Sequence, residues 1–100
     1  MFGTVGHARI VEGHETQLAE LNDEWKSTIL PMIPGVFFQA FGSSSDEFGV
    51  RVFLALAEDE ATYRNLAAMP EQDAWFRRLL EHIEGEPTWE DVEMEYTIRD

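Results

Sequence analysis

Two side chains on predicted strands could act on a bound small molecule. His7 carries an imidazole, whose charge changes near neutral pH, so it could accept a proton from a carbon acid or a phenol. The guanidinium of Arg51 could stabilise negative charge as that charge develops. The alternative interpretation is structural: His7 pairs with a carboxylate, and Arg51 forms an ion pair with Glu93 or Glu95 at a dimer interface.

Two aromatic residues on a predicted helix could shape a pocket. Tyr63 combines an apolar ring with a hydroxyl that could bind either a ligand or a backbone carbonyl. Trp75 is one residue off the apolar stripe, so it could border a cleft or fill the core or an interface; the stripe contains Phe76, Leu79, Leu80 and Ile83. Trp25 lies on the apolar stripe of an earlier helix, and we expect it in the core.

The composition argues against several kinds of site. The chain has no cysteine, which excludes disulfides, thiolate nucleophiles and zinc sites built from cysteine. Neither His14 nor His82 belongs to a recognised metal-binding signature, and the sequence has no glycine-rich phosphate loop or nucleophile elbow. We therefore predict neither a metal site nor a bound cofactor.

The chain is strongly acidic. Twenty Asp and Glu against seven Lys and Arg give a net charge of −13. This charge repels phosphate backbones and anionic membrane surfaces across a Debye length of about 10 Å at 0.1 M salt. No apolar run approaches the roughly 18 residues of a membrane span. These features predict a cytoplasmic protein that binds neither nucleic acid nor membranes.

Hydrophobic periodicity predicts four strands and two helices in one domain of residues 1–100, a length that allows a single core. Pro70 should break or kink the second helix near Met69, and Gly85 with Pro87 should end it. The strands are expected over 2–11, 36–41, 48–57 and 91–98, and the helices over 18–29 and from Asp59 onward.

This order, β-α-β-β-α-β, is that of the ferredoxin-like α+β fold, a four-stranded antiparallel sheet with two helices on one face. The alternation places these apolar residues under the helices: Ala8, Ile10, Val50, Val52, Leu54, Leu56, Val92, Met94, Tyr96 and Ile98. The opposite face should carry charges and large aromatic rings: His7, Arg9, Phe37, Gln39, Phe41, Arg51, Phe53, Glu93 and Glu95. Because such rings would form an exposed apolar patch, we predict a homodimer through this face.

Several stretches resemble the dimeric α+β barrel superfamily, and within it the domains similar to antibiotic biosynthesis monooxygenases. The resemblance covers nearly the whole chain in element order. It is carried by Trp25, Ile33-Pro34-Gly35, Glu58-Asp59-Glu60-Ala61 and Met69-Pro70-Glu71-Gln72. It implies that two sheets face one another to close a barrel, and that a ligand occupies the cleft between sheet and helices of each subunit.

Members of this superfamily include cofactor-independent oxygenases of aromatic polyketides, haem degraders and proteins without a known activity. The haem branch has an Asn on the first strand, where this chain has none, so the haem interpretation is disfavoured. The polyketide branch uses Asn, Trp, Tyr and Arg around its substrate, and the resemblance assigns these roles to Asn65, Trp75, Tyr63 and Arg51.

Two hypotheses about function follow. In the first, the dimer is a monooxygenase-like protein that lets an aromatic or hydrophobic metabolite react with O₂ without a bound cofactor, with His7 as base and Arg51 as charge stabiliser. In the second, it is a non-catalytic ligand-binding or stress-associated structural module, with His7 and Arg51 held in interface ion pairs.

Overall fold

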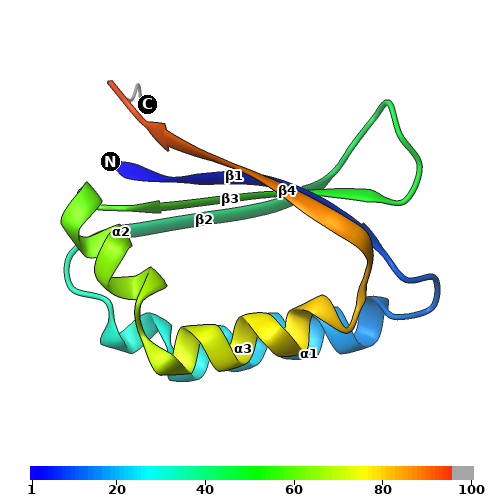
Figure 1. Cartoon of the computed structure of the whole chain (residues 1–100), viewed down its shortest axis with the longest axis horizontal. Helices are drawn as coiled ribbons and strands as arrows, with labels where there is room; N and C mark the ends of the chain where they lie inside the picture. Colours follow the sequence, from blue (N-terminus) through cyan, green and yellow to red (C-terminus); the bar gives the residue numbers. More distant parts are fainter. Residues whose placement is uncertain (96–100) are drawn as a thin grey trace.

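The chain forms one antiparallel sheet with all its helices on one side, as a computed structural model that describes residues 1–95 shows (Figure 1). The strand order is β2-β3-β1-β4. Tyr96, Thr97 and Ile98 of the predicted fourth strand lie outside the described residues. The elements are β1 (Phe2–Ile10), α1 (Glu15–Thr28), η1 (Leu30–Met32), β2 (Phe37–Ser43), β3 (Val50–Ala57), α2 (Glu60–Ala67), α3 (Pro70–Leu80) and β4 (Ile83–Glu93). The predicted ferredoxin-like α+β fold is confirmed.

Helices α1 and α3 run side by side beneath the sheet, and α2 stands at one end of it (Figure 1). The predicted break at Met69 is confirmed: Met69 is the N-cap of α3, and Pro70 occupies its first turn, where the missing N–H does no harm. Asp59 begins α2 by accepting a hydrogen bond from the Thr62 backbone N–H at 2.8 Å.

The core lies between the sheet and these helices. Trp25 is 4% exposed on α1, and Leu79 is 2% exposed on α3. Trp75, 9% exposed, is buried in place of Leu80, which the helical stripe had predicted to be inside and which is 38% exposed. The helices thus remove large apolar areas from water on one face of the sheet.

The fourth strand begins earlier than predicted. Residues 81–87 were expected to end the second helix, but α3 stops at Leu80 and β4 starts at Ile83. The pairing of β4 with β1 shifts register between His7 and Arg9, and the irregularity takes up Gly85, with φ +76°, and Pro87. An edge strand tolerates a bulge and a proline because half of its backbone groups need no partner in the sheet.

The predicted facing of β3 is wrong. Ala8, which is buried, pairs with Arg51, and Gly6 pairs with Phe53, so the odd-numbered residues of β3 lie beneath the helices. Phe37, Gln39 and Phe41 share that face, because they pair with Ala57, Ala55 and Phe53. Residues Val50, Val52, Leu54, Leu56 and Val92 lie on the opposite face, which we call the open face.

Within residues 1–95, no helix covers the open face (Figure 1). It carries Val5 and Leu54, which pair with each other, and Phe38, which is 49% exposed. His7 and Arg9 lie on it as predicted, near the end that leads to the β2–β3 hairpin. The open face is therefore more apolar than the sequence had indicated.

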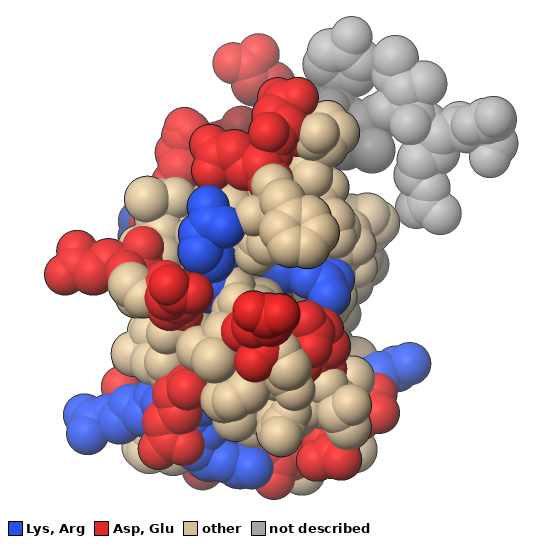
Figure 2. All heavy atoms as spheres, turned by 90° about the vertical axis from the view of Figure 1, so that its right-hand side faces the viewer, with Lys and Arg blue, Asp and Glu red and all other residues tan. Residues whose placement is uncertain are grey.

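Charged side chains are spread over much of the remaining surface, together with exposed apolar ones such as Phe48. Figure 2 shows acidic side chains spread over the end of the molecule that bears the hairpin, with fewer basic ones between them. Over residues 1–95, no helix is long and apolar enough to cross a membrane.

Candidate functional site

A cleft of about 310 Å³ opens between the sheet and helices α2 and α3. Its volume is at the lower end of the range of about 300–1,000 Å³ that is usual for small-molecule sites. The residues that line it come from all four strands and from α1, α2 and α3: Thr4, Trp25, Phe37, Gln39, Phe41, Phe53, Leu54, Ala55, Tyr63, Leu66, Ala67, Gln72, Asp73, Trp75, Phe76, Leu79 and Trp89. Aromatic rings dominate this lining.

The rings pack against one another and fix the shape of the cleft. Trp25 contacts Phe37 and Trp75, with ring centroids 5.4 and 6.4 Å apart. Trp89 contacts Phe53 and Phe76 at 6.1 and 5.7 Å. Tilted and edge-on pairs of this kind stabilise beyond the burial of their area, so the walls are held by mutual contact.

Gly6 allows Trp89 to lie close to β1. The two residues pair across the strands, and a Cβ atom at position 6 would overlap Cε3 and Cζ3 of the Trp89 ring. Gly6 is buried under this ring. The glycine therefore gives the cleft one of its aromatic walls.

Both buried indole N–H groups are used inside the protein. Trp75 Nε1 donates to the Leu21 carbonyl at 2.7 Å, and Trp25 Nε1 donates to Gln72 Oε1 at 2.7 Å. These bonds join α1 to α3 and fix the orientation of both rings.

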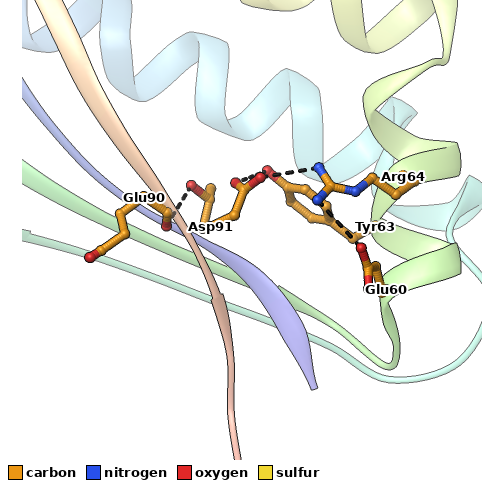
Figure 3. A network of polar contacts seen from close by, with 6 residues as sticks. Glu60, Tyr63, Arg64, Glu90 and Asp91 are labelled. Atoms are coloured by element: carbon orange, nitrogen blue, oxygen red, sulfur yellow. Dashed lines mark hydrogen bonds and ion pairs between the residues drawn. The ribbon is translucent and has the colours of Figure 1, made fainter.

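Tyr63 lines the cleft and belongs to a polar network that Figure 3 shows. Its hydroxyl donates to Asp91 Oδ1 at 3.1 Å, and Arg64 Nη1 donates to Asp91 Oδ2 at 3.1 Å. Arg64 also meets Glu60 at 3.4 Å and lies over the ring of Phe2 at 5.1 Å. Figure 3 shows Tyr63 and Arg64 reaching from α2 toward Asp91 on β4. The network ties α2 to the edge of the sheet.

The surroundings keep the Tyr63 hydroxyl protonated. Burial raises the pKa of Tyr63, and the hydrogen bond to the Asp91 carboxylate and its charge raise it further. A neutral phenol bonded to a carboxylate can orient a ligand through its ring, but it does not serve as a base near neutral pH.

The structure brings some of the predicted site residues together and separates others. Tyr63 and Trp75 both line the cleft. Asn65 is exposed on α2 and does not line it, and Arg51 is on the helix-covered face but outside the lining. His7 is exposed on the open face, so the sheet separates it from a molecule in the cleft of the same chain.

Arg51 does not lie opposite Glu93 within one chain, and its predicted ion pair with Glu93 or Glu95 at a dimer interface stays a prediction. Arg51 pairs with Ala8 at one end of the sheet, and Glu93 pairs with Phe2 at the other. This separation follows from the position of β4, which begins at Ile83 and therefore reaches the far end of β1 by Glu93.

Sequence reasoning missed much of the lining. Phe37, Phe41 and Phe53 had been assigned to the opposite face, and Gln72 and Trp89 were not considered as site residues. A signal existed for Gln72, because it stands one helical turn from Trp75, three residues along the same helix.

A second, polar hollow of about 440 Å³ lies between α1 and α3, lined by Gln17, Glu20, Leu21, Glu24, Arg78, Glu81 and His82. At its edge, His82 Nδ1 is 3.0 Å from His14 Nδ1. Across residues 1–95, no three His, Cys, Asp or Glu side chains converge as ligands of a metal ion.

Comparisons with known proteins support the fold. No family model matches the chain, and no curated protein matches it significantly. A candidate antibiotic biosynthesis monooxygenase from Caulobacter crescentus superimposes with a TM-score of 0.80 at 14% identity, over 95% of this chain and 90% of that one. A second, from Deinococcus radiodurans, gives 0.76 at 13% identity, over 100% and 98%.

A variant of SnoaB, a cofactor-independent oxygenase from Streptomyces nogalater, superimposes with a TM-score of 0.79 at 12% identity, over 99% of this chain and 97% of that one. The chain therefore has the fold of the antibiotic biosynthesis monooxygenases, and the resemblance drawn from its sequence is confirmed at the level of fold.

Proposed function

We propose that this protein binds an aromatic or otherwise hydrophobic small molecule in the cleft between sheet and helices, and that it is a monooxygenase-like protein acting without a bound cofactor. The observation that carries the proposal is the lining of the cleft: a space of about 310 Å³ walled by aromatic rings that contact one another. Apolar pockets with a few placed polar groups are the usual form of small-molecule sites. Tyr63 and Trp75 are the proposed binding residues.

The chemistry proposed for this cleft needs no external reductant. A phenol such as 1-naphthol can lose its hydroxyl hydrogen and its para hydrogen to O₂, forming the quinone and one water. One oxygen atom of O₂ becomes the new carbonyl and the other leaves in the water, so the phenol supplies all the electrons. The protein would hold the ring in a dry cleft and accept a proton.

The proton acceptor that best fits this geometry is Asp73, a carboxylate that lines the cleft and forms a 3.0 Å ion pair with Arg77. We therefore propose Asp73 as the base in place of His7. We place His7 in a dimer interface on the open face, as the structural hypothesis had it, and Arg51 outside the reacting centre.

Saturable binding of 1-naphthol, followed by the fluorescence of the cleft tryptophans, tests the binding part. Ala67→Trp places a large ring in the cleft and should abolish binding, because Ala67 lines it. Ala19→Trp makes the same change on the exposed side of α1 and should leave binding intact. Binding that survives Ala67→Trp would refute the assignment of the site.

Oxygen uptake in the presence of 1-naphthol, measured with an oxygen electrode, tests the catalytic part. We expect uptake that depends on the protein and falls at least tenfold in Asp73→Asn. Saturable binding without uptake of O₂ would instead favour the non-catalytic ligand-binding hypothesis.

We also propose that two copies associate through the open face. Leu54 lies near the middle of that face beside Val5, and Phe38 leaves 49% of its surface exposed there. Light scattering coupled to size exclusion should give a dimer for the native protein and a monomer for Phe38→Asp, a change on the open face outside the cleft lining. Leu80→Asp, on the exposed side of α3, is the matched control and should remain dimeric. A monomeric native protein would contradict the proposal.

A further inference from the structure

The side-chain amide of Gln72 has a fixed orientation in the cleft. The indole N–H of Trp25 can only donate, and it donates to Gln72 Oε1 at 2.7 Å. The oxygen of this amide must therefore face Trp25, and the Nε2 group with its two N–H donors must face away from it. Trp25 is itself 4% exposed and packed against Trp75 and Phe37, so it cannot easily release the amide.

Most other donors of the cleft are already used. Trp75 Nε1 donates to the Leu21 carbonyl, Thr4 Oγ1 donates to the Glu90 carbonyl at 3.1 Å, and the Tyr63 hydroxyl donates to Asp91. The amide of Gln39 and the indole N–H of Trp89 also border the cleft, but both side chains are exposed, Gln39 on the edge strand β2 and Trp89, at 40%, on the edge strand β4. Gln72 Nε2 is thus a donor with a set direction at an otherwise aromatic wall.

The fixed N–H donors of Gln72 select ligands, because a ligand that covers them without accepting a hydrogen bond leaves them unpaired. A hydrocarbon that covers Gln72 would take the N–H groups from water without replacing the hydrogen bond, whereas a ligand with an acceptor oxygen would restore it. The acceptor should be neutral, because Asp73 also lines the cleft and the chain carries a net charge of −13.

We propose that Gln72, oriented by Trp25, is a specificity-determining residue that makes the cleft prefer aromatic ligands bearing a neutral carbonyl oxygen over hydrocarbons of the same shape. This inference rests on the proposed function, since it assumes that the cleft binds a small molecule. Gln72 would touch the ligand, and Trp25 would act through Gln72 as a positioning residue.

The test compares 1-tetralone with tetralin, two probes that differ by one carbonyl oxygen, in sealed-cell equilibrium dialysis. The native protein should bind the ketone about three- to tenfold more tightly, the effect of one neutral hydrogen bond. Gln72→Glu keeps an acceptor for the Trp25 N–H but removes the donors, so it should abolish the preference. Gln72→Met should also abolish it while leaving the affinity for tetralin within about threefold.

Two further variants distinguish the effect of the orientation of the Gln72 amide from the effect of an added negative charge. Trp25→Phe releases the amide and should weaken the preference without removing the amide itself. Gln17→Glu makes the same chemical change as Gln72→Glu at an exposed site on α1, and it should keep the full preference.

The outcomes distinguish the two proposals. If neither probe binds, the proposed function fails and this inference falls with it. If both probes bind but the native protein shows no preference for the ketone, or if the preference survives in both Gln72 variants, the inference about Gln72 is wrong while the binding cleft stands.

Discussion

Replacing Gly6 with alanine should damage the cleft through a single methyl group. The new Cβ would overlap Cε3 and Cζ3 of the Trp89 ring and lie 3.2 Å from Cη2. The backbone of β1 can hardly retreat, because it pairs with β3 on one side and with β4 on the other. Trp89 is 40% exposed, so its ring has room to swing outward. We expect the ring to leave the strand and to lose its contacts with Phe53 and Phe76.

The expected cost is about 1–3 kcal/mol in the free energy of unfolding, the usual range for one extra carbon in a packed site. Each aromatic contact that the ring gives up contributes about 0.5–1.5 kcal/mol, which agrees with that range. For a domain of this size, each kcal/mol lowers the melting temperature by roughly 4–8 °C. Urea unfolding followed by circular dichroism, at one fixed protein concentration because the proposed dimer makes stability depend on concentration, measures the change.

A double-mutant cycle with Trp89→Ala isolates the cause. Without the indole ring, nothing near position 6 opposes the methyl group, and Gly6→Ala should then be neutral or stabilising by about 0.4–1 kcal/mol, because alanine restricts the unfolded chain. The coupling between the two sites should therefore be about 1–3 kcal/mol. If Gly6→Ala costs the same with and without Trp89, or costs nothing in the native background, the account of this cleft wall is wrong.

Two predictions concern the ionisable groups around α2. Burial and the Asp91 carboxylate raise the pKa of Tyr63 above its ordinary 10.0. The contribution of Tyr63 to stability is therefore complete below pH 10.0 and is lost as the pH rises through the raised pKa. Ultraviolet titration should show one tyrosine ionising late, and Tyr63→Phe should remove that phase. The hydrogen bond from Thr62 N–H lowers the pKa of Asp59 below 3.8, so this cap stabilises above pH 3.8 and is lost as the pH falls through the lowered value. Asp59→Ala should lower the melting temperature at pH 7. Asp59→Asn can still cap α2, so it should lose much less. Equal melting temperatures for the two variants would contradict the capping role.

Local patterns in the sequence predicted most of the elements. The spacing of Leu18, Leu21 and Trp25 produces one apolar stripe on α1, and this stripe is buried in the structure. The acidic start of α2 at Asp59 and the break before Pro70 were also readable, because capping and proline sterics act over a few residues only.

Local sequence patterns did not predict where β4 begins. Gly85 and Pro87 are typical of a helix end, and here they belong to an irregular stretch of an edge strand. Whether such residues end a helix or bend a strand depends on whether β1 is free to pair with them, which is a long-range condition.

The sequence by itself determined the order of strands and helices, and hence the ferredoxin-like order, because the apolar period, caps and prolines that mark each element act within a few residues; it did not determine where β4 begins. Only the tertiary structure decided which side of β3 faces the helices. Val52 and Phe53 are both apolar, so either facing satisfies the local pattern, and a shift of one residue exchanges the two sides. The pairing of Gly6 with Phe53 and Trp89 fixes that choice across three strands. That choice places Phe53 among the aromatic rings of the cleft and Val52 on the open face.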